Sequence, residues 1–213
     1  MRRFVGLALA AVVTASPAAA DAVHDALDKL QTRYESTKTL EADFRQTVES
    51  PTLAGALKTS GKVAFEKPNR MRWDYDPPDQ QTIVGDGTTL WLYQPDLKQV
   101  IKTPLGEAFQ ASTPLTFLSG LGRIERDFDA SLERETKDTW VLKLVPKKDA
   151  ALGTLRLTVR KSDASIAEAE IADAAGTVTK IAFSHEKRNG SIEPARFTFS
   201  PPPGVDVVKP PAY

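Results

Sequence analysis

The residue types that most often perform chemistry in proteins are sparse in this sequence. It holds two histidines, His24 and His185, and no cysteine. His185 stands in the segment SHEKRN, but a zinc-binding helix needs a second histidine at a fixed spacing, and none follows. Without cysteines, clusters of metal ligands are nearly excluded. We therefore predict no metal site and interpret His185 as a residue on the surface of a strand.

Three other patterns resemble catalytic motifs without completing them. Ser119 in FLSGLG lacks the glycine two positions earlier that a nucleophile elbow requires, because Phe117 stands there. The turn GDGTT at 85–89 has neither the lysine nor the following helix of a phosphate-binding loop. Asp74 and Asp76 share one face of a predicted strand, where solvated carboxylates are a simpler interpretation than a catalytic pair. The sequence does not favour an enzyme, and a secreted hydrolase is disfavoured.

The most informative charged residue is Lys67, in the stretch GKVAFEKPNRMRWDYDPP at 61–78. Side chains alternate between the two faces of a strand. The odd positions of this stretch carry large apolar side chains: Val63, Phe65, Met71, Trp73 and Tyr75. Lys67 shares their parity, if Pro68 and Asn69 do not shift the register. The sequence thus places an ammonium group on an apolar face, where an unpartnered charge is costly.

The overall composition is that of a neutral globular protein. The 213 residues include 28 basic and 28 acidic side chains, which gives no support for nucleic acid as a partner. Because there is no cysteine to form a disulfide, stability must come from packing. Residues 21–213 have the length of a single domain with a substantial core. No internal repeat and no linker divides them.

The first twenty residues predict a cleavable secretory signal. Two arginines precede an apolar run at 4–13, and Pro17 precedes the small residues at 18–20. The run is too short to span a bilayer, although a retained membrane anchor is the alternative. We expect cleavage before Asp21 and an exported, soluble protein.

Hydrophobic periodicity predicts one helix followed by many short strands. Residues 21–36 place apolar side chains at helical spacing, and residues 40–48 alternate with period two. Further strands, separated by turn residues, are predicted at 57–66, 69–76, 80–85, 88–94, 97–103, 139–146, 153–160, 165–173, 177–187 and 195–204. A second helical segment with Pro114 at its first position is predicted near 113–121. Closely spaced strands predict an antiparallel sheet curled toward a barrel or half-barrel.

The apolar side chains leave two interpretations open. One face of the sheet carries Phe44, Phe65, Met71 and Trp73, while the helices carry Leu27, Leu30 and the cluster at 115–121. Either the helices cover the sheet as an ordinary core, or they form a movable cover over an apolar cavity that accepts a lipid. The pattern does not separate the two. It also leaves open which side chains of strand 88–94 face inward, because that strand is apolar on both parities.

Five segments resemble the outer-membrane lipoprotein carrier protein (LolA) family. LEADFRQTV (40–48) is similar to its first strand, and KPNRMRWDY (67–75) with VGDGTTLWLYQPDLKQV (84–100) to its central block. STPLTFLSG (112–120) is similar to its lid helix, and ARFTFSPPPGV (195–205) to its C-terminal strand. The likeness keeps the same order along nearly all of residues 21–213, and the central block is its most specific part.

The resemblance implies a mainly β fold with helices (α+β), namely an incomplete, curved antiparallel β-barrel covered by lid helices over an apolar cavity. It implies a periplasmic chaperone that takes triacylated lipoproteins from an inner-membrane ABC release complex. The chaperone passes them to an outer-membrane acceptor lipoprotein, acting as a monomer without catalysis, cofactor or nucleic acid. The alternative is a periplasmic lipid- or lipoprotein-sensing regulatory module of similar fold, although such sensors carry an additional domain.

The resemblance also implies roles for individual residues. The acyl-chain cavity would be lined by Leu30, Phe44, Phe65, Met71, Trp73, Leu115, Phe117, Leu118 and Leu121. At the position of Lys67 the family commonly has an arginine that binds backbone carbonyls of the lid helices and holds the empty cavity shut. Lysine lacks the planar fork of arginine, so the alternative is that Lys67 extends past Phe65 to solvent.

Overall fold

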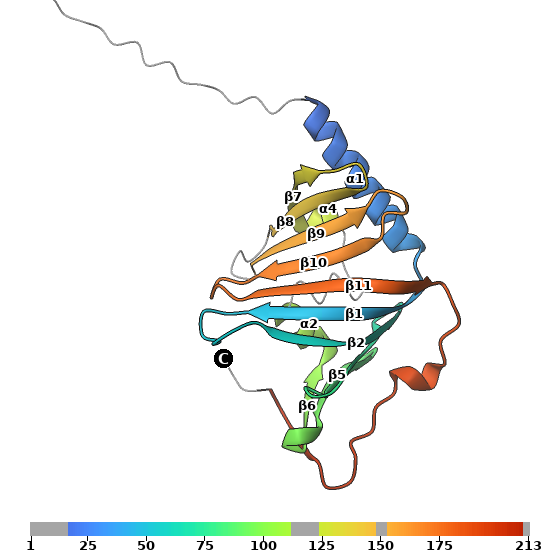
Figure 1. Cartoon of the computed structure of the whole chain (residues 1–213). Coiled ribbons are helices and arrows are strands. Elements are labelled where there is room, and N and C mark those ends of the chain that lie inside the picture. Colours follow the sequence, from blue (N-terminus) through green and yellow to red (C-terminus); the bar gives the residue numbers. More distant parts are fainter. Residues whose placement is uncertain (1–16, 112–123, 148–152, 211–213) are drawn as a thin grey trace, which may run out of the picture.

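One open, twelve-stranded sheet forms most of the molecule (Figure 1). The computed structural model describes residues 17–111, 124–147 and 153–210. The strand order is β12-β6-β5-β4-β3-β2-β1-β11-β10-β9-β8-β7, so the two end strands are β12 and β7 and the sheet does not close on itself. Every ladder is antiparallel except that of β12 with β6. The predicted fold class, mainly β with an incomplete barrel, is confirmed.

The strands are short and follow one another closely in the chain, as their alternating side chains predict. They are β1 (Thr39–Glu49), β2 (Leu57–Glu66), β3 (Arg70–Tyr75), β4 (Thr82–Asp86), β5 (Thr89–Gln94), β6 (Gln99–Pro104), β7 (Phe128–Glu135), β8 (Thr139–Pro146), β9 (Thr154–Arg160), β10 (Ile166–Ala172), β11 (Val178–Arg188) and β12 (Asp206–Val208). The helices are α1 (Pro17–Ser36), α2 (Leu105–Ala111) and α4 (Ile124–Asp127), with 3-10 turns η1 (Pro95–Leu97) and η3 (Pro194–Phe197).

Strand β1 joins two halves of the sheet. Strands β2 to β6 form one series of neighbouring hairpins, and β7 to β11 form another. On one side β1 pairs with β2, its neighbour in sequence. On the other side it pairs with β11, from Leu40 opposite Arg188 to Glu49 opposite Val178. The pairing of β1 with β11 is therefore the connection through which the two halves form one sheet.

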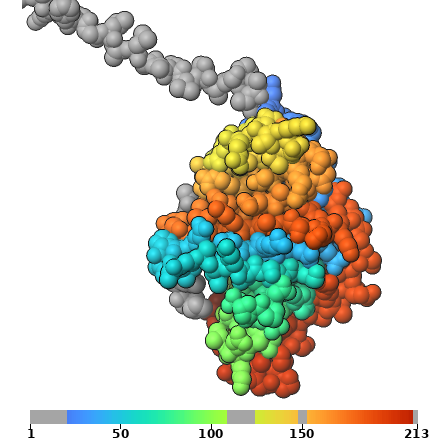
Figure 2. Space-filling model, viewed as in Figure 1, coloured from blue at the N-terminus to red at the C-terminus, as the bar shows by residue number. Residues whose placement is uncertain are grey.

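The concave face of the sheet and one side of α1 form the main core. Val63, Phe65, Met71, Trp73 and Tyr75 are all buried there, which confirms the alternation predicted for this stretch. Ala26, Leu27 and Leu30 of α1 belong to the same core cluster. Figure 2 shows the opposite, outer face of the sheet, with α1 visible only at the margins of the molecule.

Glycine 61 shows how closely this core is packed. A Cβ atom at Gly61 would lie 2.0 Å from the carbonyl oxygen of Asp74 and 2.9 Å from the ring of Phe44. The Phe44 ring in turn makes edge contacts with Trp73 and Tyr75, each at a centroid distance of 4.9 Å. A side chain at position 61 would displace either the neighbouring strand or this aromatic cluster.

The structure settles which side chains of β5 face inward. Leu92 is opposite Ile83, and Ile83 is opposite Trp73, so Leu92 shares the concave face. Trp91 and Tyr93 therefore point to the outer face, where the Phe199 ring lies 5.8 Å from each of their centroids.

The C-terminal segment differs from its prediction. No strand forms at 195–204: residues 194–197 make the turn η3, and a strand appears only at β12. Pro194 and the prolines at 201–203 have no backbone N–H to donate to a ladder, which explains the difference. The segment instead crosses the outer face, where Phe197 packs with Ala64 and Ile192 in a second small core. Burial of Ala64 on that face was not predicted.

Some elements agree with the sequence only in part. The helix predicted at 21–36 is α1, which already begins at Pro17 within the predicted signal. Strand β7 and helix α4 were not predicted, and the helical segment predicted at 113–121 lies outside the described residues. Within the described ranges, no helix combines the length and the apolar character needed to cross a membrane.

Candidate functional site

A small apolar cavity lies beneath the C-terminal half of α1. Its apolar lining comes from α1, from the strands β1, β2, β10 and β11, and from the β9–β10 turn: Leu30, Leu40, Phe65, Ala164, Ile166 and Phe183. The lining also contains four charged residues, Arg33, Lys38, Lys67 and Glu186. The cavity therefore joins both halves of the sheet and places cations beside an apolar space.

The cavity is small, and we call this small-cavity form of the protein the closed state. Its volume is about 100 Å³. Ligand pockets in proteins typically measure about 300–1,000 Å³, so a cavity this small does not hold a long acyl chain. Any larger apolar ligand requires α1 or the aromatic rings that line the cavity to move.

Lys67 connects the β2–β3 turn to the end of α1. Its backbone N–H donates to the carbonyl of Lys38, at 2.8 Å. Its ammonium group donates to the carbonyl oxygen of Tyr34 and lies 4.0 Å from the centroid of the Tyr34 ring. The Tyr34 carbonyl also accepts from the backbone N–H of Thr37 at 3.2 Å. It lies in the last turn of α1, where the carbonyls carry the negative end of the helix dipole and attract a cation. The half-buried charge of Lys67 thus has a specific partner.

Burial changes the protonation equilibrium of this lysine. Partial removal from water disfavours the charged form and lowers the pKa of Lys67, while the nearby Glu35 carboxylate acts in the opposite direction. The hydrogen bond to the helix carbonyl and the cation–π contact with Tyr34 provide local compensation for the lost hydration.

Arg33 anchors the same end of α1 to the other half of the sheet. Its guanidinium group is 2.7 Å from the Glu186 carboxylate of β11, and these two side chains are only 15% and 16% exposed. It also donates to the backbone carbonyl and to the carboxylate of Asp163 in the β9–β10 turn, each at 3.0 Å. Asn189 holds the chain just after the helix, by donating to the carbonyl of Ser36 at 3.0 Å.

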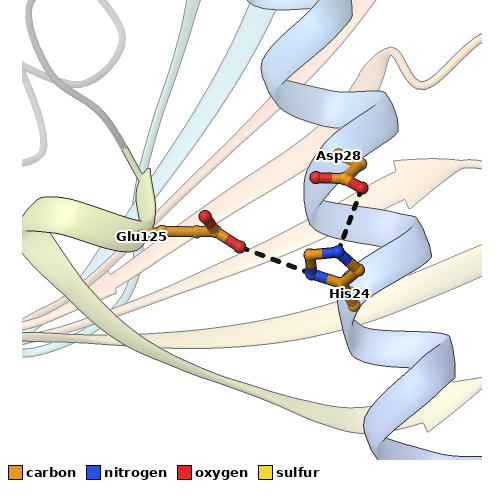
Figure 3. A group of neighbouring side chains, drawn as sticks. All are labelled: His24, Asp28 and Glu125. Carbon is orange, nitrogen blue, oxygen red and sulfur yellow. Dashed lines mark ion pairs between the residues drawn. The ribbon is translucent and has the colours of Figure 1, made fainter.

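The N-terminal half of α1 is held by exposed groups. Figure 3 shows the His24 imidazole between two carboxylates, with Asp28 at 3.3 Å and Glu125 of α4 at 3.6 Å. Histidine and carboxylates are ligand types for zinc. Here each side chain is more than 60% exposed and each ring nitrogen faces a different carboxylate. Ion pairing between α1 and α4 accounts for this arrangement.

The predicted cavity residues are only partly brought together. Leu30 and Phe65 line the cavity. Phe44, Met71 and Trp73 lie deeper, fully buried in the core behind it. The remaining predicted residues, Leu115, Phe117, Leu118 and Leu121, lie outside the described residues. The acyl-binding role of all of these positions stays a prediction.

Several cavity residues were not predicted from the sequence. Phe183 stood in an alternating segment and could have been assigned to the inner face from its parity. Arg33 and Glu186 are 153 residues apart, and no local pattern indicates that they meet. Their contact depends on the pairing of β1 with β11, which the sequence did not specify.

Two of the three incomplete catalytic patterns lie within the described residues and take part in structural interactions, whereas Ser119 lies outside the described residues. Asp74 accepts two hydrogen bonds from Arg72, and Asp76 accepts one from Ser60. Asp86 in the GDGTT turn accepts from the backbone N–H groups of Thr88 and Thr89. His185 is exposed on β11, 2.9 Å from Asp43. Each of these carboxylates and the histidine is therefore engaged in a surface or turn interaction.

Comparison with known proteins identifies the family. The profile of the family described as outer membrane lipoprotein carrier protein LolA matches residues 35–200. A protein of Chromobacterium violaceum described as outer-membrane lipoprotein carrier protein is 37% identical over 201 residues, which covers 94% of this chain and 95% of the relative. A protein of the same description from Methylibium petroleiphilum is 38% identical over 192 residues, with 89% and 93% coverage.

A solved structure supports the fold independently. An uncharacterized conserved protein of Thermus thermophilus superposes with a TM-score of 0.56 at 14% sequence identity, covering 89% of this chain and 99% of that protein. At that identity the likeness concerns the fold alone. The sequence matches extend over most of the chain, and on them this protein belongs to the family of the outer membrane lipoprotein carrier protein LolA.

Proposed function

We propose that this protein is a periplasmic carrier that shields the acyl chains of lipoproteins between the inner and the outer membrane. The observation that carries the proposal is the apolar cavity between α1 and the concave face, closed by polar contacts at one helix end. Burial of a methylene group contributes about 0.8 kcal/mol, so a long acyl chain in water represents on the order of 10 kcal/mol. A carrier must provide an apolar surface of that extent and later give the chain up.

Several features of the proposal go beyond the family assignment. Residues 1–20 would direct export and be removed, and residues 21–213 would act as one monomeric domain. Cargo would be triacylated lipoproteins, taken from an inner-membrane ABC release complex and delivered to an outer-membrane acceptor lipoprotein. The protein would act without catalysis and without a cofactor of its own. The descriptions of its relatives as lipoprotein carriers support this assignment.

Lys67 would act as the latch of the empty state. It bridges the β2–β3 turn and the end of α1, directly beside the cavity. A contact made in the closed state and lost in the open state shifts the equilibrium toward closure. Closure in turn favours release of the cargo, because the closed cavity has no room for it. The latch would therefore promote delivery rather than uptake.

The test is reconstitution of transfer with Lys67→Leu. Mature protein is incubated with membranes that contain a labelled lipoprotein and the release complex, and then with outer membranes. We expect the wild type to form a soluble one-to-one complex and to surrender the cargo, and Lys67→Leu to form the complex but to transfer the cargo several-fold more slowly.

The matched control is Lys62→Leu, which removes a lysine of β2, the strand just before the turn that holds Lys67. Lys62 is 67% exposed and pairs with Asp43 on the outer face. The Lys62→Leu variant should transfer normally. Unchanged acceptance and delivery by Lys67→Leu would contradict the latch. A soluble complex that never delivers would indicate a sensor, and a chemically altered lipid would indicate a hydrolase. Failure of the wild type to form any complex would refute the carrier function itself.

A further inference from the structure

The three tryptophans of this chain differ in whether the indole N–H group has a hydrogen-bond partner. The Trp91 indole donates to the Asp86 carboxylate at 2.9 Å on the outer face. The Glu135 carboxylate accepts hydrogen bonds from Lys161 and from the Trp140 indole. These bonds, chiefly the one from Lys161, hold the pKa of that carboxyl below its usual range. Trp73 is 2% exposed, and its Nε1 has no hydrogen-bond partner among the described residues.

An indole N–H in this position is energetically unfavourable. Buried tryptophans normally find a partner for the N–H group. Leaving a buried donor unpaired costs about 1–3 kcal/mol. A phenylalanine would fill an apolar core position without that cost, as Phe44 and Phe65 do beside it. A buried polar group without a partner in a native structure calls for a physical reason.

Trp73 lies directly behind the wall of the cavity. Its ring contacts Phe65 at a centroid distance of 5.8 Å and Phe183 at 6.3 Å. Both phenylalanines line the cavity. The closed cavity is too small for an acyl chain, so its expansion displaces the rings that line it, and those rings separate it from Trp73. An occupant of the expanded space therefore comes next to the indole.

We propose that the Trp73 N–H is a specificity group that donates a hydrogen bond to an ester or amide carbonyl of the bound acyl chain. The inference rests on the proposed function and deepens it. The apolar surface supplies affinity for any hydrocarbon, and the unpaired donor adds a preference for hydrocarbon attached through a carbonyl. Acyl groups carry such a carbonyl and simple alkyl chains do not.

The first experiment measures the NMR signal of the Trp73 indole N–H directly. Protein labelled with 15N on tryptophan gives three indole signals, assigned with Trp73→Phe, Trp91→Phe and Trp140→Phe. It is titrated with methyl laurate, and separately with tetradecane, an alkane of the same chain length that has no hydrogen-bond acceptor. We expect the ester alone to move the Trp73 proton signal downfield, because the group gains an acceptor. The Trp91 signal should stay in place, since its donor is already engaged.

The second experiment compares affinities across a cycle of two proteins and two ligands. The ester preference of each protein is its affinity for methyl laurate divided by its affinity for tetradecane. A neutral hydrogen bond should make this preference roughly two- to tenfold larger in the wild type than in Trp73→Phe. The control Trp91→Phe should keep the ester preference of the wild type. The cycle cancels any general loss of packing in the variant, because that loss affects both ligands.

The outcomes separate this inference from the carrier function. Methyl signals of Leu30 and Ile166, two cavity residues, report occupancy independently. If both ligands move these methyl signals but the Trp73 indole responds identically to each, the specificity role is wrong and the carrier function stands. If neither ligand moves any cavity methyl signal, both are wrong. If Trp73→Phe keeps the ester preference, another donor is responsible and the assignment to Trp73 is overturned.

Discussion

The two faces of the sheet differ in how completely their polar groups are paired and their space is filled. On the outer face the C-terminal segment is fixed by satisfied contacts. Arg196 pairs with Glu41 at 3.0 Å, and Arg72 donates to the carbonyl of Arg196 at 3.2 Å. Phe197, which belongs to that segment, is only 1% exposed. On the concave face there are a cavity of about 100 Å³ and the indole of Trp73 without a partner.

This difference indicates where the molecule can change. Tightly packed interiors transmit strain and open only at high cost. The concave face is itself closely packed around Gly61. Beside the cavity, where Phe65 and Phe183 border free space and the core includes the adaptable side chain of Met71, it can rearrange at lower cost. The outer face keeps the strands in register while the concave face adapts. The predictions below test that division.

The largest expected effect is a contrast between two phenylalanines. Phe197→Ala removes the centre of the outer core and should lower the free energy of unfolding by about 3–5 kcal/mol, measured by urea denaturation. Phe65 borders the existing cavity, so Phe65→Ala should lower the free energy of unfolding by a smaller amount. Adding methyl laurate should restore part of the lost stability for Phe65→Ala and none for Phe197→Ala. Equal costs without rescue would remove the distinction between the faces.

The next effect concerns the anchor of α1 on the concave side. Arg33→Met leaves Glu186 with only the more distant Arg160, at 3.6 Å. Breaking a fully buried pair costs about 3–5 kcal/mol, so we expect about 2–3 kcal/mol for this partly exposed one. Hydrogen exchange should accelerate at the C-terminal turn of α1. Acceleration confined to the N-terminal turn would show that the anchor lies elsewhere.

The smallest effect is pH-dependent and belongs to the outer face. Burial alone would raise the pKa of Asp86, but hydrogen bonds from the Trp91 indole, Thr88 and Thr89 outweigh it and lower the pKa to about 2. A carboxyl with a depressed folded-state pKa stabilises the fold above its unfolded pKa, near 3.8, and loses that contribution as pH falls toward 2.

Asp86→Asn should therefore cost about 1–2 kcal/mol at neutral pH, and the difference from wild type should vanish near pH 2. Thermal unfolding across pH 2–7 measures it. If the stability difference stays constant from pH 2 to 7, Asp86 stabilises the turn through its size and hydrogen-bonding geometry and not through its charge.

Much of the fold was predictable because its signals are local. Alternation located most of the strands and correctly placed Met71 and Trp73 on the buried face. Segment 195–204 also alternates, but its prolines have no N–H group to donate to a ladder. The alternation therefore predicted a strand that the backbone does not form. Strand β7 has an alternating Phe128, Ala130 and Leu132 that could have indicated it.

The site was less predictable because it depends on long-range pairing. The parity of Lys67 identified an unusual charge, but its contact with Tyr34 is decided by where α1 ends over the sheet. Whether the Trp73 indole finds a hydrogen-bond partner depends on all the residues that pack around it, and no local sequence pattern indicates the outcome.

The pairing of β1 with β11 has a consequence for the order of assembly. Asp43 and His185 meet across it although 142 residues separate them, whereas the hairpins within each half need only neighbouring segments. Bringing distant segments together carries an entropic cost that slows folding. The pocket draws Phe65 from one half and Phe183 from the other. The apolar cavity therefore cannot form until β11, the penultimate strand in the sequence, has paired with β1.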